Sequence, residues 1–151
     1  MTTTCPLCES VRLGPSHPDH IAELAESWVR LGEHQGPRGW CVLVAKEHVE
    51  HLSEWAPARQ AALFDDVRRV ASAIRAAFPT SGRDGPPRIN YECLGNVVPH
   101  VHWHVIPRHA DDPRPRETVW TWPREALRGG LAPADRADLV LRLRATLERR
   151  S

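Results

Sequence analysis

The clearest periodicity in the chain is that of an amphipathic helix over residues 57–78. Its large apolar residues recur at spacings of four, three, four and four, with arginine and aspartate on the other face. These apolar positions are Leu63, Val67, Val70, Ile74 and Phe78. Pro57 suits an early helical turn, and Pro79 follows the end of the pattern. The spacing therefore predicts a long helix of about six turns.

A second helical pattern lies near the end of the sequence, in Pro133–Arg150. Leu139, Leu143 and Leu147 follow one another at spacings of four, so they form a single apolar stripe. The arginines of this segment are most simply interpreted as its solvated face. We therefore predict a C-terminal helix that packs through its leucines.

Apolar runs bounded by turn residues predict strands at two places. Trp40–Ala45 follows a turn rich in glycine and proline, and Arg88–Cys93 follows a similar loop. Ile21–Leu31 is ambiguous, because its glutamates and alanines favour a helix although the segment also fits an extended arm of a hairpin. Trp120 and Trp122 flank a threonine and predict a packed extended segment. Either tryptophan could stack on a base or close the edge of a dimer, but packing in the core or at its rim is the simpler interpretation.

The most unusual pattern is His100–Ile106, in which three histidines alternate with apolar residues. A strand here would place His100, His102 and His104 on one face, with successive imidazoles about 6.5–7 Å apart. The intervening side chains would point into a core: Val101, Trp103 and Val105. Neutral imidazole serves as a nucleophile, an acid or base, a metal ligand or a hydrogen-bond donor. Chance histidines on a solvated strand are the plain alternative, but three in register opposite an apolar face argue against it.

The composition indicates one globular domain over residues 1–151. Twenty basic and 19 acidic residues leave a net charge of +1, so we expect neither nucleic acid nor a membrane as a partner, and any anion site must be local. The sequence has no apolar run long enough to cross a membrane and no signal-peptide pattern, so we expect a cytoplasmic protein.

The four cysteines, without a secretory signal, favour free thiols or a metal site over a disulfide framework. They are Cys5, Cys8, Cys41 and Cys93. Cys5 and Cys8 form a C-x-x-C pair, which in a loop-like setting suits half of a tetrahedral zinc site. A redox pair and two merely buried thiols are the alternatives.

The His-x-His-x-His-x-x run with apolar x resembles the signature of the histidine triad (HIT) superfamily of nucleotide hydrolases and transferases. Residues 94–99 before the run, Pro107-Arg108 after it, and the apolar strand that leads into Lys46-Glu47-His48 extend the resemblance over about residues 5–108. It implies an α+β fold with an antiparallel sheet of about five strands, in which Ala25–Leu31 is extended. One long helix and the C-terminal helix would pack beside the sheet, and the protein would be a homodimer.

The zinc-containing branch of this superfamily takes two ligands from the Lys-x-His segment and the first triad histidine. The resemblance therefore implies a structural zinc ion held by Cys5, Cys8, His48 and His100. Other histidines compete with His48 as local alternatives: His17, His20 and His51.

The resemblance also implies a two-step reaction at the α-phosphate of a purine nucleotide or dinucleotide. His102 would attack phosphorus, and water or another acceptor would then release the nucleoside monophosphate. His104 would contact the phosphate oxygens as the second catalytic residue. Asn90, Gly95 and Asn96 complete the predicted substrate-binding set with these two histidines, since Gly95 lets the backbone approach an anion. Asn96 stands where many members carry glutamine, and Asn90 matches a family amide only approximately.

The implied substrates are dinucleoside polyphosphates, such as diadenosine tetraphosphate, or nucleoside phosphoramidates. Two other classes of function stay open on the sequence. One is a metal-dependent phosphohydrolase with the triad as ligands, but Glu92 is the only acidic residue in the ten positions before the triad. The other is a non-catalytic nucleotide-binding sensor with a vestigial site.

Overall fold

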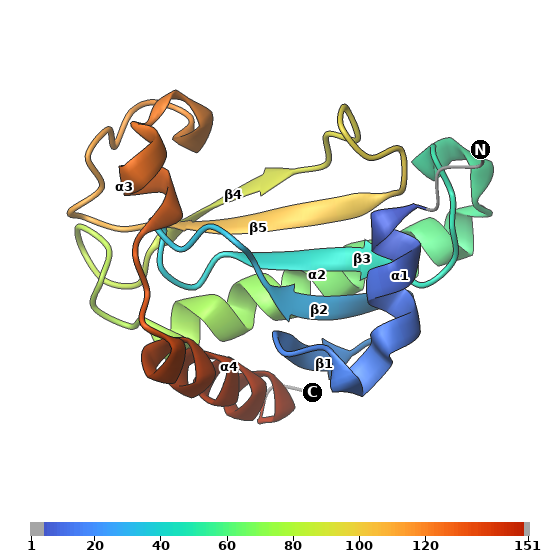
Figure 1. The fold of residues 1–151 in the computed structure, drawn as a ribbon, viewed down its shortest axis with the longest axis horizontal. Coiled ribbons are helices and arrows are strands. Elements are labelled where there is room, and N and C mark those ends of the chain that lie inside the picture. The colour runs from blue at the N-terminus through green and yellow to red at the C-terminus, as the bar shows by residue number, and fades with distance from the viewer. Residues whose placement is uncertain (1–4, 150–151) are drawn as a thin grey trace.

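The computed structural model describes residues 5–149 and shows one antiparallel sheet with α2 behind it and α1 in front of it (Figure 1). The sheet has five strands in the order β1-β2-β3-β5-β4. The strands are β1 (His20–Glu23), β2 (Ser27–Leu31), β3 (Cys41–Ala45), β4 (Arg88–Glu92) and β5 (His102–Arg108). The helices are α1 (Pro6–Leu13), α2 (Pro57–Ala77), α3 (Arg124–Arg128) and α4 (Pro133–Glu148). The predicted α+β architecture is therefore confirmed.

The two predicted helices form almost where their periodicity places them. Helix α2 begins at Pro57 and ends at Ala77, one residue before the predicted end. Helix α4 begins at Pro133 and ends at Glu148, while the predicted terminal residue, Arg150, lies outside the described residues. Proline occupies the first turn of both helices and of α1, where its missing N–H costs no hydrogen bond.

The ambiguous segment 21–31 forms strands and not a helix, and Ser27–Leu31 is extended as the resemblance implied. It forms most of the β1–β2 hairpin, and a buried aspartate of α2 holds the turn. Asp66 accepts hydrogen bonds from the backbone N–H of Ala25 and Glu26 and from the hydroxyl of Ser27, at 3.2, 2.9 and 2.8 Å. A partner from a distant helix thus overrides the local helix propensity.

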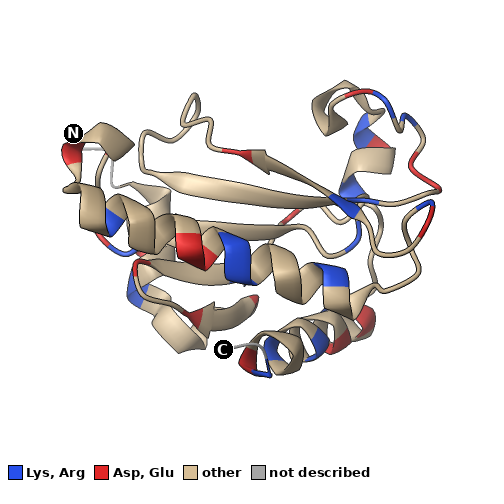
Figure 2. Ribbon diagram, turned by 180° about the vertical axis from the view of Figure 1, so that it is seen from behind, with Lys and Arg blue, Asp and Glu red and all other residues tan. Residues whose placement is uncertain are grey.

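Basic and acidic residues are interspersed along α2 and α4 (Figure 2). Some arginines of α4 do not form the solvated face that the sequence suggested. Arg136 pairs with Asp19 at 2.6 Å, and Arg144 donates to the carbonyl of His20 at 2.7 Å. These contacts attach α4 to β1 and the residues before it. None of the helices in residues 5–149 combines the length and apolar character that a membrane span requires.

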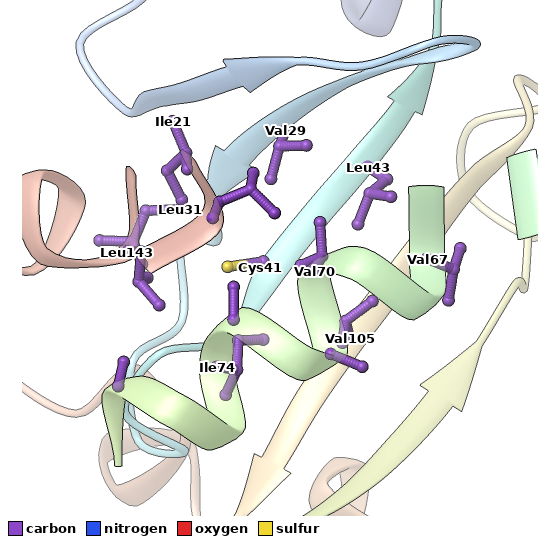
Figure 3. Close-up of a cluster of buried hydrophobic side chains, with 14 of the residues drawn as sticks. Ile21, Val29, Leu31, Cys41, Leu43, Val67, Val70, Ile74, Val105 and Leu143 are labelled. Atoms are coloured by element: carbon purple, nitrogen blue, oxygen red, sulfur yellow. The ribbon is translucent and has the colours of Figure 1, made fainter. Parts of the chain in front are cut away.

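The main core lies between the sheet and the two long helices (Figure 3). Val29, Leu43 and Val105 point from β2, β3 and β5 toward α2, and Ile74 and Leu143 meet them from α2 and α4. Burial of side chains of this size stabilises a fold by about 1.5–3 kcal/mol each. Because this core covers one face of the sheet, the alternate residues of each strand face the other side.

The segment around α3 packs against that second face. Gln35 and Gly36 donate to the carbonyls of Arg128 and Leu127 at 3.0 and 2.9 Å. A Cβ at Gly129, whose φ is +75°, would lie 2.3 Å from the carbonyl carbon of Gln35, so only glycine fits there. Val119–Thr121 form a short 3₁₀ helix, with Trp122 as its C-cap, instead of the predicted extended segment.

Candidate active site and metal centre

The strand that carries the triad begins at His102, so the prediction that all three imidazoles share one face of a strand was wrong. His100 lies just before the strand and is 1% exposed. The N–H of Val101 donates to Val49 and its carbonyl accepts from Ala45, which carries the chain past the end of β3. The first histidine is thereby held by the segment before β5 and not by the strand itself.

His100 instead joins Cys5, Cys8 and His48 in a compact cluster. One ligand atom from each residue lies within 4.8 Å of the others. The two Nδ1 atoms are 3.3 Å apart, and His100 Nδ1 lies 3.5 Å and 3.6 Å from the sulfurs of Cys5 and Cys8. A tetrahedral zinc ion with bonds of about 2.0–2.1 Å to nitrogen and 2.3 Å to sulfur requires N···N and N···S edges of about 3.3 and 3.5 Å. The four side chains therefore have the geometry of a zinc site.

A hydrogen bond fixes the ring of His100 for this role. Its Nε2–H donates to the carbonyl of Ala45 at 2.9 Å, which leaves the lone pair of Nδ1 toward the cysteines. Burial lowers the pKa of His100, so its neutral, ligating form is favoured. Partial burial and the adjacent Cys5 raise the pKa of Cys8, so a cation is what would hold the sulfurs as thiolates.

This cluster confirms the zinc prediction, although the cysteine pair does not lie in the loop-like setting that the sequence suggested. Cys5 caps helix α1 and Cys8 lies in its first turn. Among residues 5–149 this is the one cluster of three or more histidine, cysteine or acidic side chains with metal-binding geometry. It contains His48, and the competing His17, His20 and His51 lie outside it.

His102 and His104 do share one face of the sheet. They pair in register with Val44 and Val42 of β3, and their ring centroids are 5.1 Å apart. Nδ1 of His102 donates to the carbonyl of His100 at 2.6 Å. Since a carbonyl oxygen only accepts, Nδ1 carries the proton and Nε2 keeps a free lone pair.

His104 lies in a more enclosed setting. Burial, helped by the neighbouring His102 and His34, lowers the pKa of His104 to about 4, so its imidazole is neutral near pH 7. The indole Nε1–H of Trp40 donates to Nδ1 of His104 at 3.2 Å. Trp120 packs edge-on against His104, with ring centroids 5.8 Å apart. Sequence reasoning missed Trp40 as a site residue, because it was interpreted only as the start of a strand.

The remaining predicted substrate residues lie around this face. Asn90 of β4 is opposite Ile106 of β5 and is half-buried. Gly95 has a φ of +70° with open space where a Cβ would stand, and Asn96 is exposed. Gly95 and His102 line the same cavity of about 320 Å³. The structure thus brings Gly95 to the nucleophile candidate, while no contact of Asn96 with either histidine is among those described.

A second cavity of about 500 Å³ opens on the same face, over β2 and β3. Val42 and Val44, the register partners of the two histidines, line it, together with Arg30 and Arg136. Arg30 is 4% exposed, and its Nε has no hydrogen-bond partner. The sequence carried no signal for this pair of arginines, since they are 106 positions apart and meet only in the folded chain.

The chain belongs to the HIT family, because the model of the HIT domain matches residues 21–111. The match is supported by a histidine triad protein structure from Sinorhizobium meliloti 1021, which is 25% identical with a TM-score of 0.71 and covers 97% of this chain and 99% of that one. A zinc-bound histidine triad family protein from Mycobacterium smegmatis is 26% identical, with a TM-score of 0.65 and coverage of 97% and 94%.

Curated relatives are similar over a shorter region. A bis(5'-nucleosyl)-tetraphosphatase (asymmetrical) from Schizosaccharomyces pombe is 29% identical over 83 residues, which is 55% of this chain and 45% of that enzyme. Protein hit of Bacillus subtilis is 30% identical in an alignment of 96 residues that covers 55% of this chain and 66% of that protein. The chain therefore spans less than two thirds of either relative. Together with the cysteine–histidine cluster, these comparisons define a HIT protein with a zinc site.

Proposed function

We propose that this protein hydrolyses or transfers nucleotidyl groups through a covalent intermediate on His102. The main observation behind the proposal is the hydrogen bond from Nδ1 of His102 to the carbonyl of His100, at 2.6 Å. This hydrogen bond holds the neutral ring in the tautomer that has its proton on Nδ1 and its lone pair on Nε2. A fixed, neutral imidazole is what nucleophilic attack on phosphorus requires.

The reaction balances in two steps. In the first, the Nε2 lone pair of His102 forms a bond to the α-phosphorus, and the bond from phosphorus to the leaving oxygen or nitrogen breaks, with its electrons going to the leaving atom. A leaving nitrogen also takes up one proton from solvent, which the water of the second step returns. In the second, a water molecule attacks the phosphorus and loses a proton, and the P–N bond returns its electrons to Nε2. A nucleoside monophosphate is released, or a nucleotidyl product if another acceptor replaces water.

His104 and the loop before β5 would stabilise the transferred phosphate. His104 lies two residues after His102 on the same face of β5, and the centroids of the two rings are 5.1 Å apart. Gly95 lets backbone N–H groups approach a phosphate oxygen across the shared cavity. Asn96, at the exposed end of this loop, and Asn90, on the neighbouring strand, would contact the phosphates when substrate is bound.

The nucleoside part of the substrate fits the cavity of about 500 Å³ over β2 and β3. Val42 and Val44 supply an apolar floor that continues directly from the two histidines. Purine nucleotides joined through a polyphosphate or a phosphoramidate are the substrate class that we propose. The similarity to a yeast enzyme that acts on bis(5'-nucleosyl)-tetraphosphates supports the first of these.

We propose that the zinc ion is structural. It would tie α1 to the loops that lead out of β3 and into β5, since its ligands come from these three segments. His100, its most buried ligand, accepts the bond from His102 through its carbonyl. The ion would thereby support the nucleophile without contacting substrate.

A homodimer is the assembly that we propose, in a cytoplasmic setting. Strand β4 is an edge of the sheet, so no strand within residues 5–149 pairs with its outer N–H and C=O groups. Tyr91 on that strand and Phe64 on α2 are 51% and 50% exposed, so a partner subunit could cover both side chains. Sedimentation at micromolar concentration should give twice the mass of one chain, and a single-chain mass would contradict this proposal.

The experiment that tests the function compares His102→Ala and His102→Gln with the wild type. Both variants should lose turnover of dinucleoside polyphosphates and phosphoramidates by on the order of 10⁴-fold or more, because neither offers a nucleophile. The amide of glutamine can still donate to the carbonyl of His100, so this variant controls for the local structure. Both should still bind a non-hydrolysable nucleotide.

The covalent intermediate provides the second readout. Rapid acid quench of the wild type with labelled substrate should trap the label on His102. His104→Ala should retain a trapped intermediate but react about 10²–10³-fold more slowly, since it loses one stabilising donor. Near-normal turnover by either His102 variant, or label on His104, would show that the mechanism is wrong.

A further inference from the structure

We propose that Trp40 is a positioning residue that fixes His104 as the neutral imidazole with its proton on Nε2. His102 and His104 then present opposite chemistry on the same face of the sheet, a lone pair from one ring and an N–H donor from the other. The consequence for catalysis rests on the proposed function, whereas the assignment of the proton does not.

The hydrogen bond between the two rings determines where the proton lies. The indole Nε1–H of Trp40 is 3.2 Å from Nδ1 of His104. An indole N–H can only donate, so Nδ1 must accept through its lone pair. A neutral imidazole carries one proton, which therefore resides on Nε2. In His102 the carbonyl of His100 selects the opposite arrangement.

Trp40 is rigidly held, which makes this selection effective. It is 2% exposed and packs in a small apolar cluster with Ile106, Val119 and Trp122. That cluster lies on the face of the sheet that carries His102 and His104, and Leu127 of α3 packs against it. Rotation of the indole would require this cluster to separate, so the N–H direction is set by packing.

Trp120 and Glu92 complete the surroundings of His104. The ring of Trp120 meets those of His104 and Trp40 edge-on, at centroid distances of 5.8 and 5.4 Å. Its indole N–H donates to a carboxylate oxygen of Glu92 at 2.6 Å. Glu92 is the register partner of His104 on β4, so its carboxylate is the acid that faces this imidazole. The carboxylate of Glu92 is therefore already an acceptor in a hydrogen bond from Trp120.

A protonated His104 would be poorly accommodated. It would place an Nδ1–H against the indole N–H of Trp40, and two donors cannot bond to one another. The other titratable groups around it are His102 on its own strand and His34 in the turn before β3, and both disfavour a second positive charge. The ring is therefore suited to donate a hydrogen bond from Nε2 to a phosphate oxygen, and not to supply a full charge.

Nitrogen NMR of the wild-type protein tests the assignment directly. Spectra of uniformly ¹⁵N-labelled protein distinguish protonated from unprotonated ring nitrogens, and His104→Ala identifies the signals of this residue. We expect Nδ1 of His104 to be unprotonated and Nε2 protonated at pH 7. A protonated Nδ1 in the wild type would overturn the proposal, and this measurement does not depend on whether any Trp40 variant folds.

Two matched variants test the role of Trp40. Trp40→Phe keeps an aromatic ring but removes the donor, and should give a mixture of both tautomers with kcat about 10-fold lower and KM within about 2-fold. Trp120→Phe keeps the Trp40 bond and should leave the His104 tautomer unchanged. Trp40→His, which can donate from a ring nitrogen, should restore part of kcat.

An unchanged tautomer in Trp40→Phe would overturn the proposal, as would the same tautomer mixture in Trp120→Phe. The NMR result also separates this inference from the proposed function. If the wild type shows the expected proton on Nε2 but His102→Ala retains turnover, the positioning by Trp40 stands and the covalent mechanism fails.

Discussion

Removal of zinc should loosen α1 and lower the stability of the whole domain. No residue of α1 is buried. Besides the cysteines at its N-terminal end, it is held by Arg30, whose guanidinium donates to the carbonyls of Ser10 and Gly14 at 2.5 and 3.3 Å. The apolar contribution that would keep α1 in place without the ion is therefore small.

The size of the effect follows from the loops that the ion closes. Cys8 and His48 are 40 positions apart, and His48 and His100 are 52 apart. The chain-entropy relation for a covalent cross-link gives about 4 kcal/mol for one loop of either length. We therefore expect zinc removal to lower the free energy of unfolding by about 4 kcal/mol. For a domain of this size that corresponds to a fall in Tm of roughly 10 °C.

Thermal unfolding followed by circular dichroism, with and without a strong chelator, measures this fall, and added zinc should reverse it. His48→Ala should reproduce the chelator's effect, whereas His51→Ala, an exposed neighbour outside the cluster, should lower Tm by only a few degrees. Hydrogen exchange should show lost protection in α1 before the sheet. A chelated protein, shown to be metal-free by elemental analysis, that melts within 2 °C of the untreated one would refute this reasoning.

Two further predictions concern stability. Asp66→Ala should lower the free energy of unfolding in urea by about 3 kcal/mol, because the N–H groups of Ala25 and Glu26 and the hydroxyl of Ser27 lose their acceptor. Asp66→Asn should cost clearly less, and an equal loss would contradict the reasoning. The lowered pKa of His104 means that the unfolded chain binds a proton more readily, so this stability is complete above about pH 6.5 and falls by up to about 3 kcal/mol toward pH 4. His104→Gln should flatten the curve relative to the wild type, and parallel curves would argue against it.

The local pattern of apolar residues was sufficient to predict those helices and strands whose conformation depends mainly on their own residues. The apolar spacing of residues 57–78 determined α2 to within one residue, since a helix that buries one stripe must repeat it every three or four positions. The alternation around His102 and His104 likewise identified β5 and the face that both imidazoles share. The C-x-x-C pair and the triad were enough to indicate zinc through their resemblance to a family.

The same local signals failed where a distant partner decides the outcome. Segment 21–31 has helical composition, but buried Asp66 from α2 holds it as a hairpin. His100 matches the alternation of the triad, yet it leaves the strand to meet residues 52 and 92 positions away. An alternating pattern in the sequence indicates on which side of a strand a side chain lies. It does not indicate which distant segment of the chain contacts that side chain.

The patterns in the chain therefore determined the long helices and the pair of imidazoles on one strand, and its resemblance to a family implied the fold class and the zinc ligands. Only the tertiary structure decided the protonation pattern of those imidazoles. His102 is set by a carbonyl two residues away, but His104 is set by Trp40, 64 positions earlier. In His104 the proton lies on Nε2, because the indole N–H of Trp40 donates to Nδ1. Trp40 holds this position only after the core beneath α3 has packed.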